Sequence, residues 1–116
     1  MILTVGLFQL ESLALASAPH QFFDLRLQPM ALPSARVQAC LDRAQVVDSH
    51  FLMQHLENFK IGVYEPIILV CEDGRLSNSA ALDLANKGYE QVYVVEGGTD
   101  GLLREADDFS SSGNIM

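Results

Sequence analysis

The residue best placed to do chemistry in this sequence is Cys71, which directly follows four branched apolar residues, Ile67 to Val70. Such a run, bounded by turn residues, predicts a strand buried on both faces of a parallel sheet. Gly74 provides the freedom for a tight loop, and Ser77 is expected to cap a helix that runs to about Gly88. The thiol is therefore expected between the carboxyl end of a strand and the amino terminus of a helix.

That position suits a nucleophilic thiol. The N–H groups of a loop that enters a helix, together with the helix dipole, favour an anion, and a thiolate is such an anion. Because the thiolate is the attacking form, Cys71 is predicted to be a reactive nucleophile. The alternative is a small buried residue that ends the strand, since free cysteines are among the most buried residues. The local context alone leaves both interpretations open.

Composition limits the possible functions. With 116 residues, of which 49% are hydrophobic, the chain is expected to form one domain with one core. Seven Lys and Arg residues against fifteen Asp and Glu residues give a net charge of -8, which argues against nucleic acid and anionic membranes as partners. A partner with a basic surface or a neutral substrate fits this charge better. No run of about twenty apolar residues is present, so no membrane span is predicted.

The two cysteines, Cys40 and Cys71, have no neighbouring Cys or His at metal-ligand spacing. The pattern therefore predicts neither a disulfide framework nor a zinc site, and a reducing, cytoplasmic location is expected. Cys40 is interpreted as a packing residue, because nothing near it in the sequence would activate its thiol. No metal or organic cofactor is implied.

The rest of the chain alternates between strand and helix patterns, which predicts an α/β fold with a mainly parallel sheet. The stretch from 35 to 47 is ambiguous, because its apolar spacing is helical while 36–39 could equally be a short strand. On the helix expected to end near Lys60, Phe59 should face inward. The glycines at 97 and 98 lack the spacing of a phosphate-binding loop and predict a strand-to-helix turn. Strands are expected at 2–5, 21–25, 67–70 and 91–95, and helices at about 7–18, 48–60, 77–88 and 102–106.

Asp24 and Arg26 fall at the end of the second predicted strand. Side chains alternate along a strand, so these two lie on the same side. From the residues alone the simplest interpretation is a charge pair at the end of the strand.

Four motifs in order make the chain resemble the rhodanese-like family of sulfurtransferases, over about residues 3–106. They are Asp24-Leu25-Arg26, the Val-Cys-Glu-Asp-Gly-Arg-Leu-Ser segment that ends at Ser77, the Asn-Lys-Gly-Tyr segment that ends at Tyr89, and the Val-Tyr-Val-Val-Glu-Gly-Gly segment that ends at Gly98. The resemblance implies a single rhodanese-like domain over 1–106, with a mainly parallel five-stranded sheet and helices on both faces. It also favours a short strand at 36–39. Residues 107–116, with three serines, a glycine and two aspartates, are expected to form a flexible tail.

The resemblance implies the chemistry as well. Cys71 matches the catalytic position, where it would accept sulfane sulfur as a persulfide from a small-molecule or protein donor and pass it to a thiol or another nucleophile. Asp24 and Arg26 match supporting positions. The loop that would bind the substrate comprises Glu72, Asp73, Gly74, Arg75, Leu76 and Ser77.

The loop departs from the family pattern because Glu72 and Asp73 stand early in it, and Leu76 stands where many members have an arginine. At 5 to 10 Å from the sulfur, each negative charge would oppose an anion by roughly 1 to 3 kcal/mol at an effective dielectric constant near 20. The loop N–H groups, and Arg75 if it folded inward, could offset the effect on the thiolate, but the repulsion of a dianion could not easily be avoided. We therefore expect a persulfide donor and poor turnover of thiosulfate, which is a dianion.

Two other functions remain open. One is a catalytically silent rhodanese-like module that docks a protein partner. The other is phosphatase-like or arsenate chemistry, but such loops generally carry an arginine six positions after the cysteine, where this chain has Ser77. The sulfurtransferase or sulfur carrier is the preferred interpretation.

Overall fold

The computed structural model describes residues 2–17 and 19–113, with 108–113 described by their backbone alone. Five strands form one parallel sheet in the order β1-β5-β4-β2-β3. The strands are β1 (Ile2–Val5), β2 (Gln21–Asp24), β3 (Gln45–Val46), β4 (Ile67–Val70) and β5 (Val92–Val95). The helices are α1 (Leu7–Ala16), α2 (Ala35–Leu41), α3 (Leu52–Asn58), α4 (Arg75–Asn86) and α5 (Gly98–Gly113), with a 3-10 turn, η1 (Ser49–Phe51), before α3.

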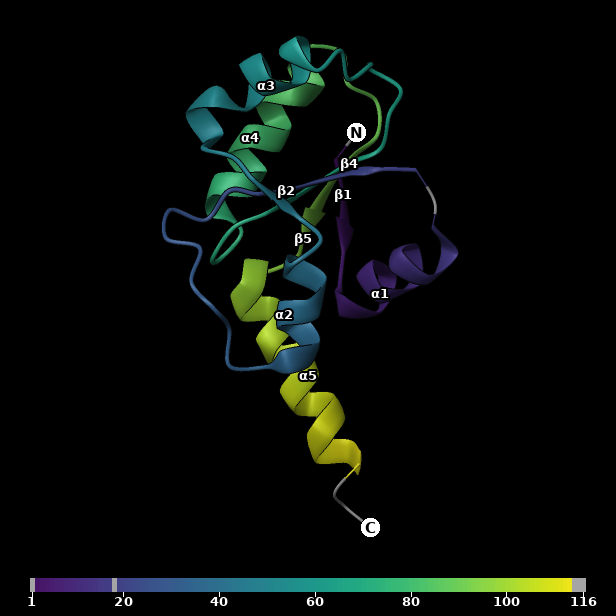
Figure 1. Cartoon of the computed structure of the whole chain (residues 1–116), viewed down its shortest axis with the longest axis vertical. Coiled ribbons are helices and arrows are strands. Elements are labelled where there is room, and N and C mark those ends of the chain that lie inside the picture. The colour runs from purple at the N-terminus through teal and green to yellow at the C-terminus, as the bar shows by residue number, and fades with distance from the viewer. Residues whose placement is uncertain (1, 18, 114–116) are drawn as a thin grey trace.

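The central strand β4 is buried on both faces, as its apolar run predicts. Ile67 and Leu69 pack into one core with residues of α3 and α4. Ile68 and Val70 pack into a second core with residues of α1, α2 and α5. The helices therefore cover both faces of the sheet, which confirms the predicted fold class (Figure 1).

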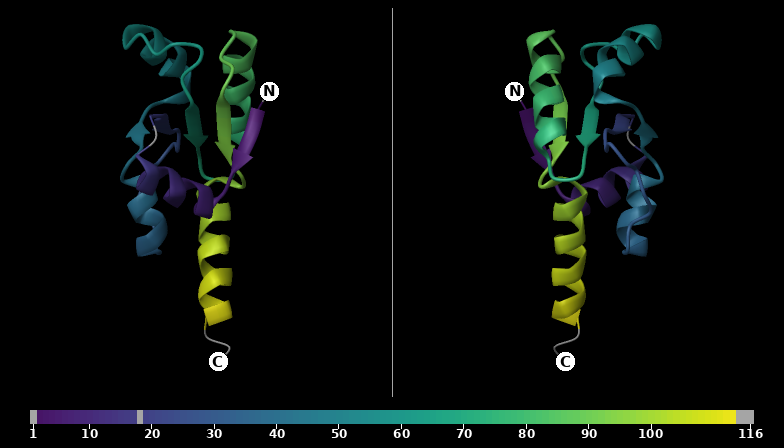
Figure 2. Two further views of the ribbon diagram at one scale, coloured as in Figure 1. Left: turned by 90° about the vertical axis from the view of Figure 1, so that its right-hand side faces the viewer. Right: turned by 90° about the vertical axis from the view of Figure 1, so that its left-hand side faces the viewer.

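All five strands end at the same edge of the sheet. Asp24 is level with Val46 on one side and with Val70 on the other, and Val5 is level with Val95. The arrowheads of β1, β4 and β5 point toward the start of α5, which extends away from the sheet (Figure 2). In parallel α/β sheets this carboxyl edge is where ligands bind.

The strand expected at 36–39 is wrong, because this segment lies in α2. Ser34 caps the helix by accepting a hydrogen bond from the Val37 N–H group, and Val37, Cys40 and Leu41 are buried at helical spacing. The short edge strand follows the helix as β3. The helical spacing of the apolar residues and the Ser34 cap therefore determine this segment, and not the strand that the family resemblance favoured.

Two helix ends also differ from expectation. Phe59 does not face inward: it is 69% exposed, because α3 ends at Asn58. The last helix begins at Gly98 rather than near Leu102 and continues beyond Ala106 to Gly113. The last part of the expected flexible tail, 114–116, lies outside the described residues, and the flexibility of the tail stays a prediction. Within the described part of the chain, no helix has the length and apolarity that a membrane crossing requires.

Candidate active site

Cys71 lies at the carboxyl end of β4, between that strand and α4. The residue that makes this arrangement possible is Gly74, which precedes α4 with a left-handed φ of 97°. This conformation suits glycine because a Cβ atom would be strained there. The loop therefore turns sharply and enters the helix at Arg75, two residues earlier than the sequence predicted.

The sulfur of Cys71 is surrounded by hydrogen-bond donors from its own loop. The Gly74 N–H group donates to Sγ at 3.2 Å and the Ser77 N–H group donates at 3.4 Å. The Ser77 hydroxyl lies 3.4 Å from Sγ, where either atom could donate, and it also donates to the Gly74 carbonyl oxygen at 3.2 Å. Two fixed backbone donors and one hydroxyl near a sulfur stabilise negative charge on it.

Ser77 thus has a different position from the one predicted. It does not cap α4; it lies in the first turn of the helix and is fully buried, with both its N–H group and its hydroxyl directed at Cys71. The sequence signal for this arrangement is the glycine at position 74, because glycine readily adopts the left-handed conformation seen there. A helix that begins directly after it brings the residue three positions later over the sulfur.

The start of α5 holds the loop after Cys71 in place, through contacts that the sequence did not predict. The Thr99 N–H group donates to the Cys71 carbonyl oxygen at 2.8 Å, and the Asp100 N–H group donates to the Glu72 carbonyl oxygen at 3.0 Å. A Cβ atom on Gly98 would collide with the Cys71 carbonyl oxygen and lie 2.6 Å from the Glu72 carbonyl carbon. Gly98 also has a left-handed φ of 63°, so glycine is required here on two counts.

The acidic side chains of the loop have partners outside the sulfur site. Glu72 accepts a hydrogen bond from the Leu27 N–H group at 3.0 Å, in the loop after β2. Asp73 forms an ion pair with Arg75, with 3.0 Å between Oδ2 and Nε. The Arg75 side chain is 91% exposed, so it does not fold inward toward the sulfur. The single basic residue of the loop itself, Arg75, is therefore already paired with Asp73.

Asp24 and Arg26 form the predicted charge pair, and it is buried. Arg26 donates from Nη2 to Asp24 Oδ2 at 2.8 Å and from Nε to both carboxylate oxygens. Its remaining Nη1 group donates to the Met30 carbonyl oxygen at 2.9 Å. A buried pair with these extra bonds fixes the segment from which the Leu27 N–H group donates to Glu72, and the N–H group of Leu25, between the two charged residues, donates to the Val70 carbonyl oxygen directly before Cys71.

Cys71 and Cys40 are both free thiols, but their surroundings differ. Cys40 lies on α2 in the second core, and burial raises the pKa of its thiol, with a further contribution from nearby Glu11. Cys71 is 1% exposed yet surrounded by donors. The interpretation of Cys40 as a packing residue agrees with its place in that core.

These features define a parallel α/β domain with a cysteine-centred, anion-stabilising loop at the carboxyl edge of its sheet. The family model for the rhodanese-like domain matches residues 11–105. The chain therefore belongs to the rhodanese-like domain family, as its motifs indicated.

Two relatives and two solved structures illustrate the similarity. Thiosulfate sulfurtransferase GlpE of Pseudomonas syringae is 32% identical over 87 residues, which cover 69% of this chain and 78% of that protein. The corresponding protein of Pseudomonas savastanoi is 34% identical, with the same coverage. A rhodanese homologue from Thermus thermophilus is 27% identical with a TM-score of 0.54, covering 88% of this chain and all of its own. A thiosulfate sulfurtransferase from Pseudomonas aeruginosa shares the fold, with a TM-score of 0.69 at 21% identity, covering 90% of this chain and 19% of its own.

Proposed function

We propose that this protein is a sulfurtransferase or sulfur carrier that holds sulfane sulfur on Cys71 as a persulfide. One observation carries the proposal: two backbone N–H groups, from Gly74 and Ser77, converge on Cys71 Sγ. These donors stabilise the thiolate and keep the nucleophile in one orientation. The similarity to proteins named thiosulfate sulfurtransferase supports the same chemistry.

The reaction has two displacement steps without net oxidation. The Cys71 thiolate attacks the outer sulfur of a donor persulfide; the new S–S bond forms as the donor S–S bond breaks, and the donor leaves as a thiolate. An acceptor thiolate then attacks the outer sulfur on Cys71, and Cys71 leaves as the thiolate that began the cycle. Because Cys71 must stay reduced between cycles, a reducing compartment such as the cytoplasm suits this chemistry.

The charge of the loop favours a persulfide donor over thiosulfate. Asp73 and Arg75 neutralise each other, and the Glu72 carboxylate accepts a hydrogen bond from the neutral Leu27 N–H group, so residues 72–75 carry one net negative charge. Thiosulfate would bring two more negative charges toward this loop, where each like-charge contact costs roughly 1 to 3 kcal/mol. Thiosulfate carries both charges on the reacting group itself, whereas the charges of a persulfide such as glutathione persulfide lie on carboxylates away from its S–S bond, so the cost is smaller for the persulfide.

The first experiment is intact-mass spectrometry of the protein after exposure to thiosulfate and, separately, to glutathione persulfide. We expect one added sulfur from the persulfide, less from thiosulfate, and none in Cys71→Ser. Absence of added sulfur from both donors would refute sulfur transfer and favour the docking module instead.

The loop variants Glu72→Gln and Asp73→Asn test the donor preference. Glu72→Gln keeps an oxygen to accept the Leu27 N–H bond while removing charge, and Asp73→Asn frees Arg75 from its charged partner. Both should raise the rate with thiosulfate more than the rate with glutathione persulfide. Equal changes with the two donors, or no change, would show that loop charge does not set donor preference.

A further inference from the structure

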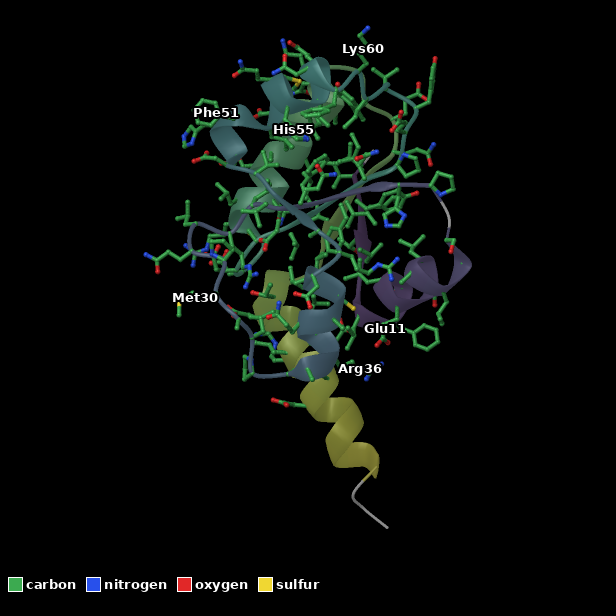
Figure 3. All side chains as sticks on the ribbon, in the orientation of Figure 1. Glu11, Met30, Arg36, Phe51, His55 and Lys60 are labelled. Carbon is green, nitrogen blue, oxygen red and sulfur yellow. The ribbon has the colours of Figure 1, made fainter. Side chains whose placement is uncertain are left out.

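Apolar side chains are exposed beside the catalytic loop. Leu27 is 76% exposed, Met30 is 67% exposed and Val46 is 61% exposed. Leu27 and Met30 come from the loop after β2, where the Met30 side chain points outward (Figure 3), and Val46 comes from β3. We call these three residues the apolar rim. Leu27 and Val46 line the same hollow, and exposed apolar side chains that adjoin one another mark interaction surfaces.

The apolar rim lies next to the reactive sulfur. Val46 and Val70 are each level with Asp24, so β3 lies two strands from β4, a separation of about 10 Å. Leu27 is closer to the loop, because its N–H group binds the Glu72 carboxylate at 3.0 Å. A hollow of about 170 Å³ separates Leu27 from Val46. It is lined by Leu25, Arg26, Leu27, Pro29, Val46, Val47, Asp48 and Ser49.

Acidic groups surround the apolar rim and the loop. Asp48, whose side chain is 53% exposed, lines the same hollow, and Glu72 and Asp73 extend from the catalytic loop. The basic side chains nearby are already paired: Arg75 with Asp73, Arg26 with the buried Asp24, and His50 with Asp48. An occupant of this surface therefore needs apolar groups for the rim and basic groups for its border.

We propose that the apolar rim is the docking surface for a protein whose reactive cysteine is flanked by apolar and basic side chains. This inference rests on the proposed sulfur transfer for the identity of the reactive group on the partner. A small anionic thiol such as glutathione offers neither the apolar contact nor the positive charge that this surface complements. The occupant is therefore a protein sulfur donor or acceptor, and its cysteine reaches Cys71 while neighbouring residues cover Leu27 and Val46.

Binding is tested without chemistry, using Cys71→Ser protein and fluorescent peptides in which serine replaces the reactive cysteine. One peptide carries leucine and lysine around the serine, and its matched control carries leucine and glutamate. By fluorescence anisotropy at low salt, the lysine peptide should bind at least about tenfold more tightly, with an advantage that shrinks as salt is added. Equal affinities for the two peptides would overturn the inference.

Variants then locate the surface. Leu27→Ser with Val46→Ser should weaken binding of the lysine peptide about tenfold. The matched control is Phe8→Ser with Leu15→Ser on α1, two residues that are 73% and 88% exposed, and it should leave binding unchanged. The docking surface is refuted if both double variants bind alike.

The same design separates docking from catalysis. Wild-type protein is exposed to glutathione persulfide, and its sulfur is then transferred to the cysteine forms of the two peptides. Transfer to the lysine peptide should be about tenfold faster than to the glutamate peptide, and the apolar-rim variant should lose this advantage. If the serine peptide binds as expected but Cys71 accepts no sulfur, the docking surface stands and the proposed function fails. If sulfur loads normally and transfer rates are equal for both peptides, the docking surface fails alone.

Discussion

The Ser77 hydroxyl tests whether the side chains around Cys71 tune its reactivity. In the thiol form the hydroxyl donates to the Gly74 carbonyl oxygen at 3.2 Å and lies 3.4 Å from Sγ. When the sulfur becomes a thiolate, the hydroxyl can turn its proton to Sγ. Ser77→Ala removes this option while it retains both backbone N–H donors. The variant therefore isolates one donor of three.

The expected size of the effect follows from the two hydrogen bonds that the Ser77 hydroxyl exchanges: the bond to the Gly74 carbonyl oxygen is given up, and a bond to the thiolate is gained. A hydrogen bond to a charged group contributes about 1.5 to 3 kcal/mol, and the neutral bond to Gly74 that is given up contributes about 1 kcal/mol. The net stabilisation of negative charge on the sulfur is about 0.5 to 2 kcal/mol, which corresponds to about a two- to thirtyfold change in the labelling rate. Gly74 keeps the N–H bond from Asn78, so the folded state should lose little stability.

The assay is the rate of iodoacetamide labelling of Cys71 near neutral pH, followed by peptide mass spectrometry so that Cys40 is counted separately. Ser79→Ala is the matched control, because Ser79 lies on the exposed side of the same helix. Ser77→Ala should label about two to thirty times more slowly than wild type, and Ser79→Ala should label at the wild-type rate. Equal rates for the two variants would show that the hydroxyl contributes nothing and that the backbone donors act alone.

Three further predictions concern the Gly98 turn, the Glu11–Arg36 ion pair and the Cys40 thiol. Gly98→Ala should lower the free energy of unfolding by at least about 2 kcal/mol, because the new Cβ would collide with the catalytic loop at a left-handed φ of 63°; Gly62→Ala, where nothing lies within 4 Å, should have little effect in the same urea titration. The hydrogen bond from Arg36 lowers the pKa of Glu11 below 4.5 (both labelled in Figure 3), so the pair stabilises the fold fully above that pH and less as pH falls through the lowered pKa. The difference in urea midpoint between wild type and Arg36→Gln should therefore shrink in acid, and a constant difference would contradict the assignment. Burial raises the pKa of Cys40, so it should label much more slowly in the native protein than in urea, and equal rates would place it at the surface.

The sequence predicted the central strand and the position of Cys71 because both depend on local patterns. Four consecutive branched apolar residues bounded by turn residues are typical of a strand buried on both faces of a parallel sheet. The sequence also showed the helical spacing of Val37, Cys40 and Leu41, and this spacing predicted the helix correctly where the family resemblance favoured a strand. Local periodicity predicted this segment better than alignment by resemblance.

The details around the sulfur were less predictable, because they depend on contacts between distant segments. The residue after a glycine turn can begin a helix directly, so the capping pattern at Ser77 was misleading. The Thr99 bond to the Cys71 carbonyl joins two strand ends that only the sheet order brings together. The sequence identified Gly98 as a turn residue, but its close approach to the loop appears only in three dimensions.

The donors to the Cys71 sulfur are mostly backbone groups. The stabilisation of the sulfur is therefore independent of the charge that the loop side chains carry. The Gly74 and Ser77 N–H groups depend on the turn and on the start of α4, so they persist whatever side chains the loop carries. The side chains of Glu72 and Asp73 point to other partners, so they can alter the charge that a donor meets without moving the nucleophile. The unusual acidity of this loop is therefore compatible with the backbone donors around Cys71, and under the proposed function we expect it to affect the choice of sulfur donor rather than the capacity to carry sulfur.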